Sequence, residues 1–199
     1  MQSQEKQDDL RLGFLAAAKV SEQGYIGGLL VTNGYGRPLE FQCTAPVTPN
    51  RTQQILYGPT LVPFILGELI GRTLIERVDV RPQLVLIEQP EILDVRPHVR
   101  VPVAYLVDEA EKTATAKRPQ VGEAPANGEE RSDQETGGPE RANRMAINGR
   151  QLRFHSAHTS DRDVIATKRN LIPQDANLEE PFERVREALN ETMRAGAAQ

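Results

Sequence analysis

The sequence has little of the material from which many catalytic and binding sites are built. It holds one cysteine, Cys43, which excludes an internal disulfide. Aromatic residues make up 5% of the 199 residues, and no apolar run approaches the roughly 18 residues of a membrane helix. It contains no phosphate-binding loop and no nucleophile-elbow sequence, and the glycines from Gly24 to Gly36 do not lead into a helix. We therefore expect no membrane partner and no cofactor.

The charge balance and the start of the chain bear on partners and compartment. The chain carries 24 Lys and Arg against 28 Asp and Glu, a net charge of -4. This acidity argues against a general nucleic-acid binder, which needs a basic face to release phosphate counterions. The first residues lack the basic-then-apolar order of a secretory signal, and a single cysteine fits a reducing compartment. We expect a cytoplasmic protein with no nucleic-acid partner.

The sharpest change in composition lies between Lys112 and Arg144. Val121 is the only apolar side chain larger than alanine, proline aside, in that stretch, so its burial could not offset the entropy of ordering the chain. We predict a disordered acidic insert or linker, interpreted as a spacer, and a division of the chain on either side of it. The predicted parts are a disordered tail (1–9), an α+β core (10–108), the insert (109–147) and a C-terminal strand with helices packed on the core (148–199).

The first part of the core predicts strands. Apolar residues alternate along Leu10–Val20 with period two, which favours a strand. Tyr25–Val31 is apolar on both faces, as in a central strand. Asn33-Gly34-Tyr35-Gly36 then provides residues that tolerate positive φ, and Pro38–Ala45 alternates again. This order predicts a β-hairpin.

A long helix and further strands follow the hairpin. An apolar stripe predicts a helix that begins near Thr60, which can cap it, and runs to Val78; Gly67 and Gly71 on its flank predict close backbone packing. Strand-like runs cover Leu84–Glu88, Glu91–Val95 and Val99–Val107. Since Pro102 lacks an N–H for a ladder, we place the last of these at a sheet edge. The fold class predicted is α+β, an antiparallel or mixed sheet with a long central helix and C-terminal helices.

Two copies of Asp-Val-Arg-Pro end in Arg81-Pro82 and Arg96-Pro97. A binding role for the arginines is conceivable. We interpret Arg-Pro instead as the extended entry into a strand, because proline biases its predecessor away from the helix.

The densest group of ligand-type side chains is His155-Ser156-Ala157-His158, followed by Asp161. Two histidines and one carboxylate could bind a metal. On a strand, however, residues three apart point to opposite faces, and the helix expected nearby begins only at Ser160. The other chemical candidate is Cys43 as a thiol nucleophile with His155 or His158 as its base. We interpret Cys43 as a core residue, because it shares a strand face with Leu39 and Phe41.

These observations lead to a functional hypothesis. We predict a non-enzymatic module for protein interaction or assembly, homodimeric through the edge strand near Val99–Val107, since an exposed edge can pair with another chain. The alternatives are a cysteine-dependent hydrolase at Cys43 and a metal-dependent enzyme at His155, His158 and Asp161. Whether the chain is an enzyme stays open, with the non-enzymatic interpretation preferred.

Overall fold

The computed structural model describes residues 10–20, 24–108 and 143–197. The predicted N-terminal tail and residues 109–142 of the predicted insert lie outside the described residues. The last part of the region assigned to the insert forms a strand, Arg144–Ile147. Its apolar residues Met145 and Ile147 pack into the core beneath the helix Glu180–Ala197.

A seven-stranded mixed sheet forms the centre of the fold, which confirms the predicted α+β class. The strand order is β3-β2-β1-β4-β5-β7-β6. Three antiparallel strands are followed by two that run parallel to β1 and by an antiparallel hairpin. The strands are β1 (Arg11–Lys19), β2 (Tyr25–Asn33), β3 (Pro38–Cys43), β4 (Leu84–Ile87), β5 (Val103–Leu106), β6 (Arg144–Ile147) and β7 (Arg150–Phe154).

The predicted hairpin joins β2 to β3. The side chain of Asn33 accepts hydrogen bonds from the backbone N–H groups of Tyr35 (3.1 Å) and Arg37 (3.0 Å). Gly36 has a φ of +79°, which favours glycine. The turn chemistry read from the sequence is therefore what closes the hairpin.

The helical run between β3 and β4 begins earlier than predicted. Asn50 forms a capping box with Gln53, so the run begins at Arg51 and leaves Thr60 inside it. Its segments are α2 (Arg51–Tyr57), η1 (Gly58–Thr60), α3 (Leu61–Pro63), the π-helical η2 (Phe64–Gly71) and α4 (Arg72–Arg77). By length and composition these 27 residues could cross a membrane, although the core helix of a soluble protein passes the same test; 28% of the apolar window is buried.

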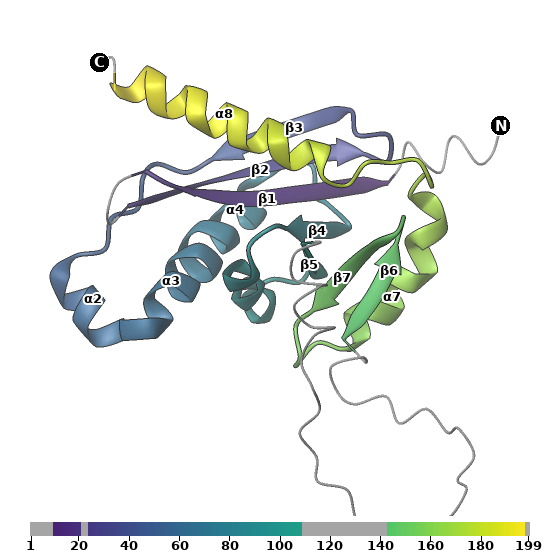
Figure 1. The fold of residues 1–199 in the computed structure, drawn as a ribbon, viewed down its shortest axis with the longest axis horizontal. Helices are drawn as coiled ribbons and strands as arrows, with labels where there is room; N and C mark the ends of the chain where they lie inside the picture. The colour runs from purple at the N-terminus through teal and green to yellow at the C-terminus, as the bar shows by residue number, and fades with distance from the viewer. Residues whose placement is uncertain (1–9, 21–23, 109–142, 198–199) are drawn as a thin grey trace, which may run out of the picture.

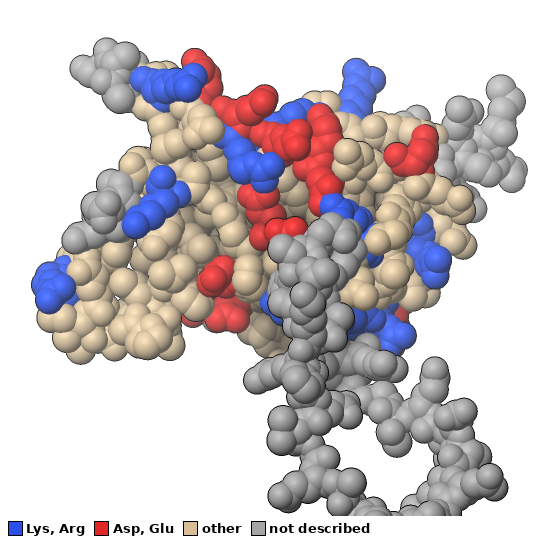
Figure 2. All heavy atoms as spheres, in the orientation of Figure 1, with Lys and Arg blue, Asp and Glu red and all other residues tan. Residues whose placement is uncertain are grey.

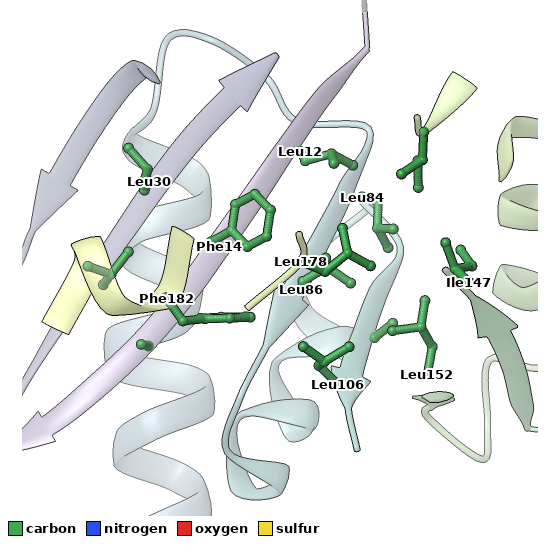
Figure 3. Packing of buried hydrophobic residues seen from close by; sticks show 14 of the residues in the cluster. Leu12, Phe14, Leu30, Leu84, Leu86, Leu106, Ile147, Leu152, Leu178 and Phe182 are labelled. Atoms are coloured by element: carbon green, nitrogen blue, oxygen red, sulfur yellow. The ribbon is translucent and has the colours of Figure 1, made fainter. Parts of the chain in front are cut away.

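Two helical layers cover the two faces of the sheet (Figure 1). On one face, α8 (Glu180–Ala197) packs over β1 and β2, and Phe182 meets Phe14 edge-on with ring centroids 5.3 Å apart. Figure 3 shows this core of leucines and phenylalanines. The helix α7 (Ser160–Lys168), continued by η4 (Arg169–Leu171), adds to the same layer. On the other face, η2, α4 and η3 (Pro90–His98) bury a second cluster.

Two sequence expectations for the region after β4 are wrong. Residues predicted as the strand Glu91–Val95 belong to the 3-10 helix η3, which packs against η2; a Cβ on Gly67 would lie 3.0 Å from the backbone nitrogen of Val95. The strand β5 is not at an edge, because β4 and β7 flank it. Pro102 precedes the ladder, where its missing N–H is not needed, and its carbonyl accepts a hydrogen bond from Val85.

Candidate functional site

The carboxyl ends of β1 and β4 are the first place to look for a site, because ligands of open α/β sheets bind there. In this chain, the side chains of Gln89, Glu88 and Arg186 lie at these strand ends and bond to neighbouring elements. Gln89 bonds to both the N–H (3.0 Å) and the carbonyl (2.6 Å) of Ala17, and Glu88 forms an ion pair with Arg186 of α8. Within the described residues, no group of three or more His, Cys, Asp or Glu could hold a metal ion.

Cys43 lies far from the histidines proposed as its base. It ends β3, half-buried against the core under α8. His155 directly follows β7, five strand-to-strand steps away in the sheet. At about 4.8 Å a step, this separates the two by about 24 Å. The structure therefore does not bring the cysteine and histidines together.

The two histidines lie in a turn between β7 and α7, neither on a strand nor on a helix. The N–H of His158 donates to the carbonyl of His155 (3.0 Å), and the ring centroids are 5.5 Å apart. The imidazoles do converge, in a local structure that the sequence reasoning had not considered.

Asp161 is committed to another partner. Arg96 of η3 binds both of its carboxylate oxygens, with Nε 2.5 Å from Oδ2 and Nη2 2.7 Å from Oδ1. The Asp161 side chain is 3% exposed, so this fork leaves little room for a metal beside the two histidines. Arg96 therefore has a structural role inside the helix η3, and its interpretation from the sequence as the extended entry into a strand is wrong.

A cavity of about 300 Å³ opens beside His155. It lies between η3 and the β6–β7 hairpin, on the sheet face that η3 covers. Its walls combine apolar side chains with basic, acidic and amide groups. They are Pro90, Leu93, Asp94, Asn143, Arg144, Arg153, Phe154, His155 and Ser156.

Two arginines stand directly opposite each other in the wall of this cavity. Arg144 of β6 and Arg153 of β7 are paired across the antiparallel ladder, so their side chains share a face. The guanidinium carbon of Arg153 lies 4.8 Å from the ring centroid of Tyr105. The two guanidinium groups therefore line the same wall of the cavity.

The cavity lining also includes a neutral imidazole and an amide whose oxygen is shielded from solvent. The Oδ1 atom of Asn143 is buried and has no hydrogen-bond partner. His155 Nδ1 accepts a hydrogen bond from the N–H of Ala157 (3.2 Å), which leaves Nε2 as the protonated nitrogen of the neutral ring. Burial lowers the pKa of His155, and the neighbouring His158 lowers it further. This site can thus donate to an anion and accept from a polar hydrogen.

The charge of the folded part differs from that of the whole chain. The described residues hold 18 Lys and Arg against 16 Asp and Glu. From Arg144 to Arg169 there are six basic and two acidic residues, and one of the two acids is Asp161. In Figure 2, acidic side chains gather beside α8, while basic side chains are spread over the visible face, some toward α7 and others on α8 and near α2. The net charge of -4 therefore conceals the excess of basic residues between Arg144 and Arg169.

His155 is recognisable from the sequence as a candidate site residue, whereas the pairing of Arg144 with Arg153 is not. Arg144 and Asn143 fall at the end of the polar segment interpreted as insert, and nothing local marks that they return to the sheet. The signal available was the alternation of Arg144, Met145, Ala146 and Ile147 before Asn148-Gly149, a two-residue hairpin turn.

Comparisons with known proteins found structural neighbours only. No protein-family model matches the chain, and no curated protein does. Endonuclease V of Ciona intestinalis, in complex with an inosine-containing 24mer DNA, superposes with a TM-score of 0.43 at 12% identity over 96% of each chain. Human ENDOV gives 0.41 at 13% identity, over 94% of this chain and 86% of that one. A D234N form of the Ciona enzyme with a 23mer DNA gives 0.40 at 11% identity, over 96% and 95%.

These neighbours contradict the functional hypothesis formed from the sequence. The proteins found are endonucleases, two of them holding DNA, whereas the sequence led us to expect a non-enzymatic protein-binding module without a nucleic-acid partner. The structure removes its physical basis too, because β5 has no free edge for a second copy. At these TM-scores the likeness transfers no activity to this chain, and its function has to be argued from its own residues.

Proposed function

We propose that this chain binds single-stranded nucleic acid, with one nucleotide seated in the cavity between η3 and the β6–β7 hairpin. The observation that carries the proposal is the opposition of Arg144 and Arg153 across the β6–β7 ladder. Two guanidinium groups on one face form a fork for a phosphate, which arginine recognises better than a single point charge does. The Nε2–H of His155 is a third donor in the same cavity wall.

The rest of the nucleotide accounts for the remaining lining. Ser156 lines the cavity, and its hydroxyl can accept a hydrogen bond from an exocyclic amino group or a sugar hydroxyl. Asp94 is a second acceptor in the wall and would repel a phosphate, which directs the phosphate to the arginine side. Bases offer their edges and faces freely only when unpaired. These features favour a single strand over a duplex.

The proposal contains no metal-dependent step. The imidazole of His155 is the only one that lines the cavity in the described part of the chain, and Asp161 is held by Arg96. His155 could therefore give or take a proton at a bound phosphate, but the described residues present no nucleophile fixed beside it by a hydrogen bond. Binding is what the geometry supports.

Fluorescence anisotropy of a labelled single-stranded oligonucleotide tests the proposal. We expect saturable binding that an unlabelled single strand competes away more effectively than a duplex of the same sequence. Arg144→Gln should weaken binding about tenfold, as expected for removal of one charge-assisted hydrogen bond. Arg194→Gln is the matched control, because Arg194 stands 81% exposed on α8. No binding by the unmodified chain, or equal binding by Arg144→Gln, would overturn the proposal.

A further inference from the structure

A second cavity, larger than the proposed nucleotide site, is separate from it. It has a volume of about 600 Å³ and lies at the amino ends of β4 and β5. The loop from α4 to β4 forms one wall, and the loop from η3 to β5 forms the other. Lys168 closes it at the end of α7. Small-molecule sites typically have volumes of about 300–1,000 Å³, so this cavity is of suitable size.

Its charge is strongly one-sided. Arg81, Arg100 and Lys168 line it, and the single acidic residue in its wall, Glu76, already pairs with Arg72 at 2.8 Å. His98 also lines it and lies 3.7 Å from Glu68. The Nη1 atom of Arg81 donates to the carbonyl of Ile75 (3.3 Å), which fixes the guanidinium at the rim. The wall therefore gathers three cations whose charge its own acid does not neutralise.

Apolar groups form the rest of the wall. Ile75 and Val99 are buried, and Pro82 and Pro102 stand on the two loops. Each loop carries a proline, and Pro82 belongs to one of the two Asp-Val-Arg-Pro copies. The first arginine of the repeat thus faces this cavity, whereas the second, Arg96, is buried on Asp161.

From this combination we infer a second binding site, for a small organic anion that carries a carboxylate, sulfonate or phosphate on an apolar body. The anionic group would meet Arg81, Arg100 and Lys168. The apolar body would fill the space between Ile75, Val99 and the prolines, where burial of its surface stabilises the complex. The inference is independent of the nucleotide site, because the two cavities share no lining residue.

Titration with 8-anilinonaphthalene-1-sulfonate, a sulfonate on an apolar aromatic body, tests this site through the fluorescence of the probe. We expect saturable binding by the full chain and a loss of affinity of at least about tenfold in Arg100→Gln/Lys168→Gln. Arg194→Gln should bind the probe as the unmodified chain does. Thermal unfolding of each variant shows whether it is folded.

A second variant keeps the charges and removes the space. Val101→Phe should place a ring in the cavity and weaken probe binding while Arg100 and Lys168 remain. Equal probe affinity in the unmodified chain and in Arg100→Gln/Lys168→Gln would overturn the inference. An equal loss of probe affinity in Arg194→Gln would also overturn it, because the loss would then follow from the overall charge of the protein and not from the cavity.

Discussion

Arg96 of η3 and Asp161 of α7 form a nearly buried, two-bond ion pair, with nitrogen–oxygen distances of 2.5 and 2.7 Å and side chains only 12% and 3% exposed. The pair joins the crossover between the two parallel strands to the first turn of a helix 65 residues later. It therefore fixes the turn that carries His155 and His158 against η3, and with it one wall of the proposed nucleotide cavity.

Removing one partner of this pair should destabilise the fold strongly. Asp161→Asn or Arg96→Met leaves the other charge buried without a counterion, which costs about 3–5 kcal/mol. The double variant Arg96→Met/Asp161→Leu should be less destabilised than either single variant. Urea unfolding measures all three. Arg72→Gln, which breaks the exposed pair with Glu76, is the control and should change stability by under about 1 kcal/mol.

The arginine pair should be worth more to binding than to stability. Arg144→Gln removes one of two like charges opposed in the β6–β7 ladder, so the free energy of unfolding should stay constant or rise by about 0.2–1 kcal/mol. The same substitution is expected to weaken oligonucleotide binding. A clear fall in stability, measured by urea unfolding, would show that Arg144 has a structural role.

Binding at His155 should depend on pH with a defined sign. Burial and the neighbouring His158 lower the pKa of His155 from its ordinary 6.5 in the free protein. A phosphate beside the ring would favour the protonated form and raise that pKa in the complex. Affinity should therefore increase as the pH falls from the pKa of the complex toward that of the free protein, and level off below it.

The same residue predicts an opposite trend for the unliganded protein. Because the pKa of His155 is lower in the folded state, the unfolded chain binds more protons, and stability should fall as the pH drops below about 6.5. His155→Gln should flatten its contribution to both profiles. Anisotropy titrations and urea unfolding between pH 5 and 8 measure the two trends; an unchanged binding profile in His155→Gln would remove His155 from the site.

Gly67 should tolerate no side chain. A Cβ there would meet the backbone nitrogen of Val95 at 3.0 Å and the carbonyl carbon of Asp94 at 3.2 Å. Since backbone atoms do not rotate away, Gly67→Ala should cost about 1–3 kcal/mol despite the better helix propensity of alanine. Thr73→Ala at an exposed position of the same helical run should be neutral or slightly stabilising. Urea unfolding compares the two variants.

Local chemistry let the sequence predict the hairpin, the close packing at Gly67 and the α+β class. Asn33 and Gly36 have the chemistry and backbone freedom that a tight turn needs, and Gly67 leaves room for the backbone packed against it. The errors came from long-range pairing. Pro102 indicates an edge only if no strand arrives from elsewhere, and β7 arrives from about 45 residues later in the chain.

The site depends on the same long-range pairing. The alignment of Arg144 with Arg153 exists only once β6 and β7 have joined the sheet, and the commitment of Asp161 to Arg96 spans 65 residues. The spacing of residues near His155 in the sequence indicates neither of these two contacts. The basic excess between Arg144 and Arg169 is not visible in the net charge of -4, because that sum includes acidic residues outside the described part.

The most direct test of the central claim is the salt dependence of single-stranded oligonucleotide binding. For a strand held through phosphates, the logarithm of affinity falls linearly with the logarithm of salt concentration. Arg144→Gln/Arg153→Gln should lower affinity and reduce this slope by about 0.7 for each phosphate that the variant no longer neutralises, whereas Arg194→Gln should leave both unchanged. Equal slopes and affinities for the double variant and the unmodified chain would contradict a nucleotide site at the β6–β7 hairpin.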